Sequence, residues 1–318
     1  MTADSHAAEG RAPEDRAPTL IHEALLYRDR EQLTRAIRDF VQSSAAADEP
    51  VLALMPSTTL EWLPGALGEL AENMSFEDIG VVGRNPNLLL SVFEGWLDDH
   101  DGHGRLISEA IWPGRSYSEI VECLRHEALI NHALAARDAT ILCPFDAAHL
   151  DAETIGGAQL THPQLIGEDG KSHSNPQFGE LADVLAERWP MQAPQEPISE
   201  FAFDGDLGGL RRATAEDPAI RSLPPERRFD MVFAINEAAT NAFVHGDGKC
   251  RTRIWEDGTF VVSEVSSSPE MDDRLVGRRR PPIDATAGRG LWLINEVCDL
   301  VEVRSGHGET VVRMHVRA

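Results

Sequence analysis

Apolar and polar positions follow two different spacings in the first half of the chain. Segments in which apolar residues recur at helical spacing alternate with short, continuous apolar runs typical of buried parallel strands. The helical segments are Arg30–Val41, Thr58–Asn73, Asn87–Asp98 and Ser116–Ala135. The strand-like runs are Pro50–Met55, Ile79–Val82 and Ala139–Phe145. Helices that alternate with apolar strands predict an α/β domain with a mainly parallel sheet.

A boundary follows this half. Thr161–Gln177 is polar and rich in turn-forming residues, which predicts a loop. A short helix over Glu180–Trp189 comes next, and then Pro190–Pro197 holds three prolines. We expect an extended, semi-stiff linker there, because proline restricts the backbone to extended conformations.

The second half has a different order of elements. Its patterns predict two helices, a β-hairpin, a third helix and a second hairpin. The helices are Leu207–Ala215, Pro225–His245 and Gly288–Cys298, and the strands are Arg251–Trp255, Thr259–Ser266, Leu300–Arg304 and Thr310–Val316. This order predicts an α+β sandwich with helices on one face of an antiparallel sheet.

Length and charge restrict the protein further. The chain has 318 residues, which suits two domains. We expect a disordered tail over 1–18, domains over 19–189 and 199–318, and a linker over 190–198. The net charge of −24 argues against direct binding to nucleic acid or to an anionic membrane. Four scattered cysteines, no long apolar run and no signal peptide predict a soluble, cytoplasmic protein with reduced thiols.

One helix of the second half carries residues suited to nucleotide chemistry. Glu237, Asn241 and His245 recur at i, i+4 and i+8, so they line one stripe of the predicted helix. The side-chain oxygen of an asparagine is a hard ligand suited to Mg²⁺, which also binds nucleotide phosphates. A carboxylate one turn away is placed to act as a base.

A second motif is glycine-rich. Gly288 and Gly290 open a predicted helix within Thr286–Trp292, where backbone N–H groups can approach phosphates. Taken alone, each motif has a structural alternative, a solvated helix face for the first and a turn for the second.

The two motifs, in this order and on these elements, resemble the GHKL ATPases of the anti-sigma-factor, serine-kinase branch. The resemblance runs from about Ser199 to the C-terminus. It implies ATP and Mg²⁺ as cofactors, with Glu237 as general base and Asn241 as magnesium ligand. It also implies nucleotide contacts from His245, Gly246, Gly288, Arg289, Gly290 and Leu291, and from Arg278 in a segment like the ATP lid of relatives.

The sequence departs from this family at the adenine site. The family carries an Asp-x-Gly after the central strand, whose carboxylate binds the adenine amino group. Here Ser267 and Pro269 stand at the expected positions, and Glu264 points to the opposite face from Val265. Loss of a charged acceptor costs about 1.5–3 kcal/mol, so we expect ATP binding to be weakened or lost.

The first half resembles the MEDS sensory domain over about Ile21–His162. The matching stretches are His22–Tyr27, Glu109–Arg115, Glu127–Asn131, Cys143–Asp146 and Thr161–Pro163. The resemblance implies a RecA-like α/β sensor for a small organic molecule of unknown identity. No GxxxxGK[ST] motif is present, so we expect no P-loop nucleotide site in this half.

Polar residues in these stretches are candidates for a ligand pocket at the ends of strands. They are His22, Glu109, Arg115, Cys143 and His162. A structural turn around Trp112 and a structural role for His22 are equally open. His126, Glu127 and His132 lack the spacing of an HExxH zinc site, so their side chains do not share a helix face.

These observations leave two main functions open. The first is a signal-sensing anti-sigma regulator that binds a sigma factor or a STAS anti-anti-sigma protein and acts as an ATP-dependent serine kinase. The second is a degenerate, non-catalytic ATPase fold that serves as a ligand-dependent binding module. A histidine kinase is disfavoured, because no phospho-acceptor helix pair is evident. The oligomeric state, including a homodimer, stays open.

Overall fold

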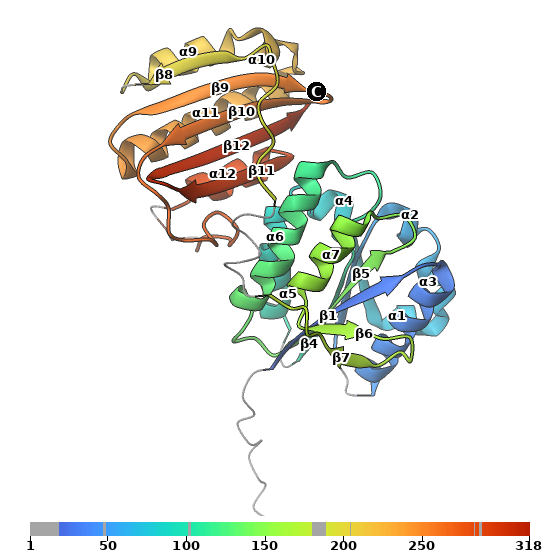
Figure 1. Ribbon diagram of the computed structural model, residues 1–318. Helices are drawn as coiled ribbons and strands as arrows, with labels where there is room; N and C mark the ends of the chain where they lie inside the picture. Colours follow the sequence, from blue (N-terminus) through green and yellow to red (C-terminus); the bar gives the residue numbers. More distant parts are fainter. Residues whose placement is uncertain are drawn as a thin grey trace, which may run out of the picture.

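A computed structural model describes residues 19–46, 49–100, 103–179, 189–203, 205–282, 284–285 and 288–318. The predicted tail and residues 180–188 of the predicted helix Glu180–Trp189 lie outside these ranges. The described residues form two β-sheets, each covered by its own helices (Figure 1). Each half of the chain therefore builds a separate sheet and core.

The first sheet is mainly parallel, as predicted. Its strands lie in the order β3-β2-β4-β5-β1-β6-β7, and only the β6–β7 pair at one edge is antiparallel. The strands are β1 (Leu20–Tyr27), β2 (Val51–Met55), β3 (Met74–Asp78), β4 (Gly104–Ser108), β5 (Ala139–Asp146), β6 (Gln164–Ile166) and β7 (Ser172–Ser174). The middle strands are continuous apolar runs because helices bury both of their faces.

Helices cover both faces of this sheet. Alternate strand residues point to opposite faces, so Ala24 and Leu25 belong to different apolar clusters. The helices are α1 (Arg30–Ala45), α2 (Ser57–Leu60), α3 (Leu63–Leu67), η1 (Gly68–Asn73), α4 (Ile79–Val82), η2 (Pro86–Leu88), α5 (Leu89–Asp98), α6 (Tyr117–Ala133) and α7 (Ala152–Thr161). Residues of α1 and α3 pack on one face, and residues of α5, α6 and α7 pack on the other.

The second sheet is antiparallel, in the order β11-β12-β10-β9-β8. Its strands are β8 (Ser199–Phe203), β9 (Cys250–Asp257), β10 (Phe260–Ser267), β11 (Leu300–Gly306) and β12 (Glu309–Arg317). The helices of this half are α9 (Leu207–Ala215), α10 (Pro218–Ser222), α11 (Pro225–His245) and α12 (Gly290–Val297). They pack on one face of the sheet, which confirms the predicted α+β sandwich.

The opposite face of the second sheet carries paired charges. Glu264 lies across from Arg253 and Arg313 on the neighbouring strands and forms ion pairs with both. The linker between the two sheets crosses this face (Figure 1), where the main-chain carbonyl of Gln192 accepts a hydrogen bond from Arg313. The Glu264 side chain thus points to the outer face of the sheet, away from the helices, as predicted from its position beside Val265.

Most predicted elements are present, but one prediction of a strand is wrong. Ile79–Val82 is helix α4, capped by Asp78, and the strand is the preceding segment β3. Thr58–Asn73 is broken into α2, α3 and η1, since Pro64 and Gly68 interrupt the helical pattern. Within the predicted loop Thr161–Gln177, β6 and β7 form a short hairpin.

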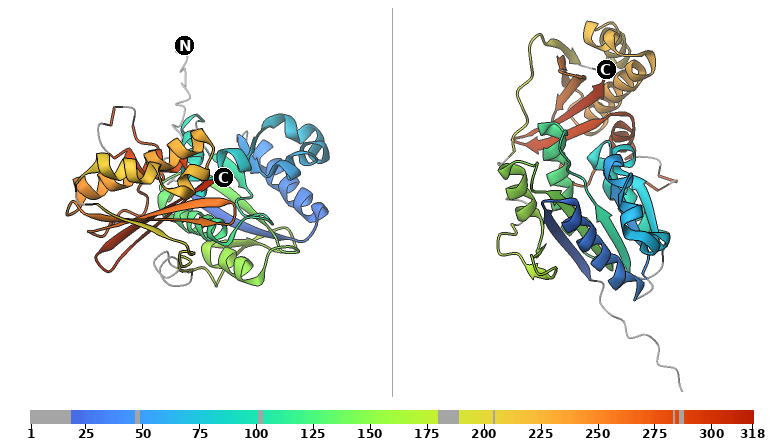
Figure 2. Two further views of the ribbon diagram at one scale, coloured as in Figure 1. Left: turned by 90° about the horizontal axis from the view of Figure 1, so that it is seen from above. Right: turned by 90° about the vertical axis from the view of Figure 1, so that its right-hand side faces the viewer.

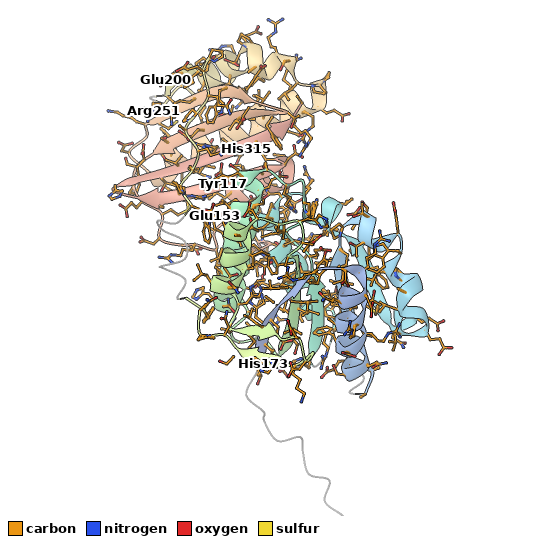
Figure 3. The ribbon with its side chains drawn as sticks, turned by 45° about the vertical axis from the view of Figure 1, so that its right-hand side comes forward. Tyr117, Glu153, His173, Glu200, Arg251 and His315 are labelled. Carbon is orange, nitrogen blue, oxygen red and sulfur yellow. The ribbon has the colours of Figure 1, made fainter. Side chains whose placement is uncertain are left out.

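The two halves meet through a defined set of elements. Figure 2 shows the two sheets in separate lobes, and contacts join η2 and α6 of the first half to α12 and β11 of the second. Tyr117, at the start of α6, lies beside the second sheet, on which His315 is labelled in Figure 3. Among the described residues, no helix combines the length and apolar character needed to cross a bilayer.

Candidate functional site

A cavity of about 340 Å³ lies between α11, α12 and the end of β10. Its walls include six of the residues that the sequence marked for nucleotide contacts: Asn241, His245, Gly246, Gly288, Gly290 and Leu291. The structure therefore brings together two motifs that lie more than forty positions apart in the sequence.

Contact between Asn241 and Gly290 closes one end of this cavity. A Cβ atom at Gly290 would lie 3.0 Å from both the Nδ2 and the Oδ1 atom of Asn241. The N-terminus of α12 can therefore lie this close to the Asn241 amide because residue 290 is a glycine and has no side chain. Backbone N–H groups at that helix end and the Asn241 oxygen can face one bound anion and its cation.

The end of α11 makes a similarly close approach to the loop that follows β10. A Cβ atom at Gly246 would lie 2.1 Å from the carbonyl oxygen of Ser268. Gly246 is therefore required where it stands, because any side chain would push the helix end away from the cavity wall. His245, the preceding residue, is exposed at the rim.

The other end of the cavity has hydroxyl groups in place of the expected carboxylate. Ser267 and Pro269 both line it, and Thr310 lies across from Ser267 on β12. The Thr310 hydroxyl donates to the carbonyl of Pro269 at 2.9 Å. Glu270 is the one acidic residue among the described residues of the wall, and its carboxylate accepts a hydrogen bond from the Gly308 N–H.

Three other predicted residues do not line the cavity. Glu237 is half-buried on α11, one turn before Asn241. Arg289 is the residue before α12, and its guanidinium donates to the carbonyl of Pro282 at 3.0 Å. Arg278 is buried and bonded to the first half of the chain. Thr286 and Ala287 of the glycine-rich segment lie outside the described residues.

Arg278 belongs to the loop that joins β10 to α12, residues 268–289, which we call the β10–α12 loop. Glu270, Met271 and Val276 of this loop line the cavity. Arg278 donates to Glu122 of α6 at 2.9 Å, and Ser91 of α5 donates to the Arg278 carbonyl at 2.8 Å. One loop therefore forms a wall of the cavity and is bound to the first domain.

Glu122 is the central charge of this interface. Its two carboxylate oxygens accept bonds from Arg278 and from Arg304 of β11, at 2.9 and 2.8 Å. Burial of Glu122 opposes its ionisation, but the charges of Arg304, Arg125 and Arg278 outweigh burial and hold its pKa below the ordinary value. Glu122 therefore stays charged, as a buried residue with arginine partners must.

Asparagine side chains form a second part of the interface. Asn85 donates to the Oδ1 and main-chain oxygens of Asn295 on α12, both at 3.0 Å. Asn87 donates to the same Oδ1 and to the carbonyl of Val301. Asn295 in turn donates to the carbonyl of Gly277, so the network ends in the β10–α12 loop. Five hydrogen bonds between buried amides and carbonyl oxygens thus favour one arrangement of the two halves, although the Oδ1 atom of Asn87 has no partner among the described residues.

The polar candidates of the first half fall into separate groups. His22, Cys143 and His162 meet in the core, together with Glu127 of α6. They do not lie at the carboxyl ends of strands, because His22 is the third residue of β1. Arg115 is not part of the group, since it stacks 3.7 Å from the centre of the Trp112 ring in a turn.

Glu109 forms a second group where β1 and β4 end. Tyr27 donates to its carboxyl at 2.6 Å, and Thr59 donates to the other oxygen at 3.4 Å. Burial raises the pKa of Glu109 to about 7, and the charge of Asp146 adds to the shift, while the bond from Tyr27 opposes it. This carboxyl therefore titrates near neutrality.

Family models match both halves of the chain. Residues 21–163 match the MEDS model, the methanogen/methylotroph DcmR sensory domain. Residues 204–316 match the histidine kinase-like ATPase domain, which agrees with the antiparallel sheet and the cavity beneath its helices. The chain joins a MEDS sensory domain to a histidine kinase-like ATPase domain.

Comparison with other proteins adds little to these two matches. Among proteins with curated descriptions, none matches this chain. A crystal structure of RsbU and RsbW domains from Mycobacterium tuberculosis matches at 18% identity with a TM-score of 0.28. That match covers 40% of this chain and 33% of the other.

The cavity of the ATPase domain fits one end of a magnesium nucleotide better than the other. Asn241 and the glycines beside it offer an oxygen ligand and unobstructed backbone at the phosphate end. At the opposite end, Ser267 and Thr310 supply only hydroxyl groups, and Glu270 is engaged by Gly308. Hydroxyls accept hydrogen bonds more weakly than an ionised carboxylate does.

Proposed function

We propose that this protein is a signal-dependent regulator in which the MEDS domain controls the nucleotide cavity of the ATPase domain. The observation that carries the proposal is the double role of the β10–α12 loop, which lines the cavity through Met271 and Val276 and is bound to α5 and α6 through Arg278. A small molecule that shifts α6 would also move the β10–α12 loop, because a buried ion pair holds this loop to α6. The wall of the cavity would then change.

The partner that we propose is a sigma factor or a STAS anti-anti-sigma protein. The resemblance of the ATPase domain to the anti-sigma, serine-kinase branch supports this choice. A bound Mg-ATP would supply the phosphoryl group for transfer to a partner serine. Asn241 would hold the metal, and Glu237, one turn earlier on α11, would take the proton of the serine hydroxyl.

The protein regions assigned to these roles are 19–189 for sensing, 190–198 as linker and 199–318 for partner binding. Direct contact with nucleic acid forms no part of the proposal, because the net charge of −24 repels phosphate backbones.

A second candidate function is a non-catalytic binding module that has lost its nucleotide. Ser267 and Pro269 favour it, since they leave the adenine end of the cavity without a free carboxylate. The same interface with the MEDS domain would then alter partner binding alone.

Titration calorimetry with Mg-ATP separates the two candidates. The full-length protein is compared with Asn241→Ala, with Ser267→Asp, and with Asn236→Ala as the control. Asn236 lies on the same helix and accepts a bond from Arg211, away from the cavity wall. We expect Ser267→Asp to tighten binding about tenfold to a hundredfold, the value of one charged hydrogen bond.

Binding that Asn241→Ala abolishes and Asn236→Ala preserves would support the kinase, and a serine-phosphorylation assay with Glu237→Ala would follow. If neither the natural protein nor Ser267→Asp binds Mg-ATP, the nucleotide role is wrong and the binding module is the better account.

A further inference from the structure

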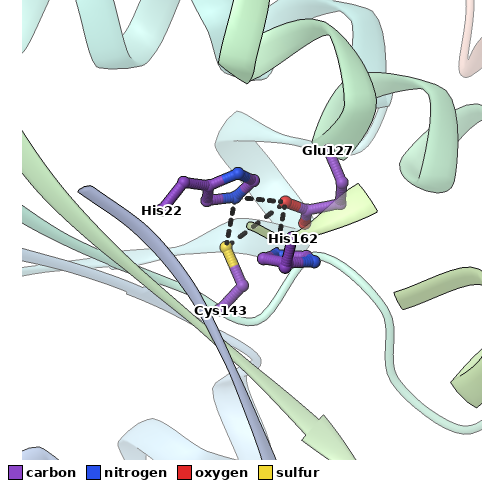
Figure 4. A group of neighbouring side chains, drawn as sticks. All are labelled: His22, Glu127, Cys143 and His162. Atoms are coloured by element: carbon purple, nitrogen blue, oxygen red, sulfur yellow. Dashed lines mark hydrogen bonds and ion pairs between the residues drawn. The ribbon is translucent and has the colours of Figure 1, made fainter. Parts of the chain in front are cut away.

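Four side chains with metal-binding atoms meet in the core of the MEDS domain. His22 comes from β1, Glu127 from α6, Cys143 from β5 and His162 from the residue after α7 (Figure 4). All four are buried, and their donor atoms lie within 4.8 Å of one another. These residues span 140 positions of the sequence, so only the fold brings them together. We call them the His22 cluster.

Hydrogen bonds outside the cluster fix the tautomer of both histidines. The Nδ1 atom of His162 lies 2.7 Å from the carbonyl oxygen of Ala158, which can only accept, so Nδ1 carries a hydrogen. The Nδ1 atom of His22 lies 3.0 Å from the Oδ1 atom of Asn131. Asn131 donates through its Nδ2 atom to the carbonyl of Thr161, so its oxygen faces the ring and accepts.

Both Nε2 atoms therefore point lone pairs into the cluster when the rings are neutral. Metal-bound histidines commonly show this arrangement, with one ring nitrogen bonded to a protein acceptor and the other directed at the metal.

The cluster contains more hydrogen-bond acceptors than hydrogens that can be donated to them. The Oε2 atom of Glu127 lies 3.3 Å from His22 Nε2, 3.5 Å from His162 Nε2 and 3.3 Å from Cys143 Sγ. With the tautomers above, the thiol hydrogen is the one hydrogen among these four atoms. Within the described part of the chain, His162 Nε2 makes no hydrogen bond. A buried carboxylate facing two lone pairs is repulsive unless a proton or a metal cation lies between them, and a metal ion satisfies all of these acceptors at once.

The two nitrogen–oxygen separations are long for hydrogen bonds and suit a shared metal ion better. Hydrogen bonds from nitrogen to oxygen are commonest at about 2.9–3.0 Å. Zn–N bonds of about 2.0–2.1 Å and Zn–S bonds of about 2.3 Å place the ligand atoms of a tetrahedron about 3.3–3.6 Å apart. Four of the six separations between the donor atoms, at 3.3, 3.3, 3.4 and 3.5 Å, are close to these edges, and all six are within 4.8 Å.

We propose that His22, Glu127, Cys143 and His162 bind a divalent transition-metal ion, with Zn²⁺ as the preferred species. Imidazole and thiolate ligands select this class of metal over Mg²⁺ and Ca²⁺. Four protein ligands complete a tetrahedron and leave no open position, so the ion is held for structure or sensing and not for hydrolysis. On binding, Cys143 releases its thiol proton to solvent and coordinates as thiolate.

The metal would also fix the element that contacts the ATPase domain. Glu127 lies on α6 five residues after Glu122, the residue that pairs with Arg278 and Arg304. An ion that ties α6 to β1 and β5 therefore holds the interface helix in place. The metal site does not depend on whether the ATPase domain binds a nucleotide.

The test uses the full-length protein stripped of metal with a chelator and then titrated with Zn²⁺ or Co²⁺ without nucleotide. We expect a single metal ion per chain by elemental analysis after dialysis, and a thiolate-to-cobalt charge-transfer band in the near ultraviolet. Zinc should also raise the unfolding temperature. Cys143→Ser should abolish the band, and Cys123→Ala, a change at another buried thiol of the same domain, should preserve it.

A second variant tests the metal site without removing any of its four ligands. Asn131→Ala leaves the four donors in place but frees the His22 ring, and we expect about 10–100-fold weaker metal binding. The proposal is overturned if the natural protein retains no Zn²⁺ after dialysis and shows no Co²⁺–thiolate band. It is also overturned if the band survives Cys143→Ser.

Discussion

Single buried residues in this protein are governed by what surrounds them more than by their residue type. Glu109 and Glu122 are both almost fully buried carboxyls of the MEDS domain. Glu122 faces arginines and stays ionised, whereas Glu109 faces Tyr27 and Thr59 and has a raised pKa. The two carboxyls consequently contribute to stability in opposite ways as pH changes.

Glu109 should make the protein less stable as pH rises. Its folded-state pKa of about 7 lies above the unfolded value of 4.5, so the folded state binds the proton more tightly. The stabilisation is complete below about pH 4.5 and is lost as pH rises through 7, a change of about 3 kcal/mol. Glu109→Gln should remove this dependence in denaturant unfolding between pH 5 and about 8. A wild-type pH profile in the variant would contradict the assignment.

Which individual residues matter was only partly predictable. Asn241 and Gly290 could be named from their motifs, because helical spacing and a helix-opening glycine carry chemical meaning within a few positions. In the sequence, Glu127 opens the MEDS-like stretch Glu127–Asn131, and its spacing from His126 and His132 is wrong for a metal site. His22, Cys143 and His162 were named as pocket candidates, but the sequence does not place them beside Glu127. They come from β1, β5 and the residue after α7, which meet only after the parallel sheet has formed.

Secondary-structure elements were predicted best where their pattern was long and uniform. The helices α9 and α11 match the predicted ranges, whereas Ile79–Val82 was assigned to a strand and is a helix. Four apolar residues do not distinguish a strand from a single helical turn, and the cap from Asp78 decides the outcome. The strands β1 and β4 mix polar with apolar residues, so their burial was not evident from sequence.

The helix α6 links the core of the MEDS domain to the ATPase domain, and its start is fixed by a capping box. Ser116 accepts from the Glu119 N–H, and the Glu119 carboxylate accepts from the Ser116 N–H at 2.8 Å. Ser116→Ala should cost about 1 kcal/mol of stability. This corresponds to about 2–4 °C in the unfolding temperature of a domain of this size.

Thr34→Ala provides the control for the capping-box variant. Thr34 lies inside α1, where its hydroxyl bonds to the carbonyl of Arg30 and alanine is the better helix former. Equal losses for Thr34→Ala and Ser116→Ala in a thermal melt would show that the cap contributes nothing specific.

At the scale of the whole molecule, the β10–α12 loop connects the cavity of the ATPase domain to the MEDS domain. Met271 and Val276 face the cavity, while Arg278 and Arg279 are held by Glu122 and Glu94 of the MEDS domain. Arg278 was expected at the nucleotide phosphates, yet in this arrangement it lies at the domain interface. We propose that the MEDS domain withholds Arg278 from the cavity until a signal moves α6.

The most direct test of this account measures Mg-ATP affinity when the hold on Arg278 is weakened. Calorimetry would compare Glu122→Gln with Glu153→Gln, an exposed change on the neighbouring helix α7, each in the natural protein and in Ser267→Asp. We predict that Glu122→Gln tightens binding about tenfold, or 1.4 kcal/mol, because the freed guanidinium can reach the phosphates. An affinity that Glu122→Gln leaves unchanged or weakens, in a protein that remains folded, would contradict control of the cavity by the MEDS domain.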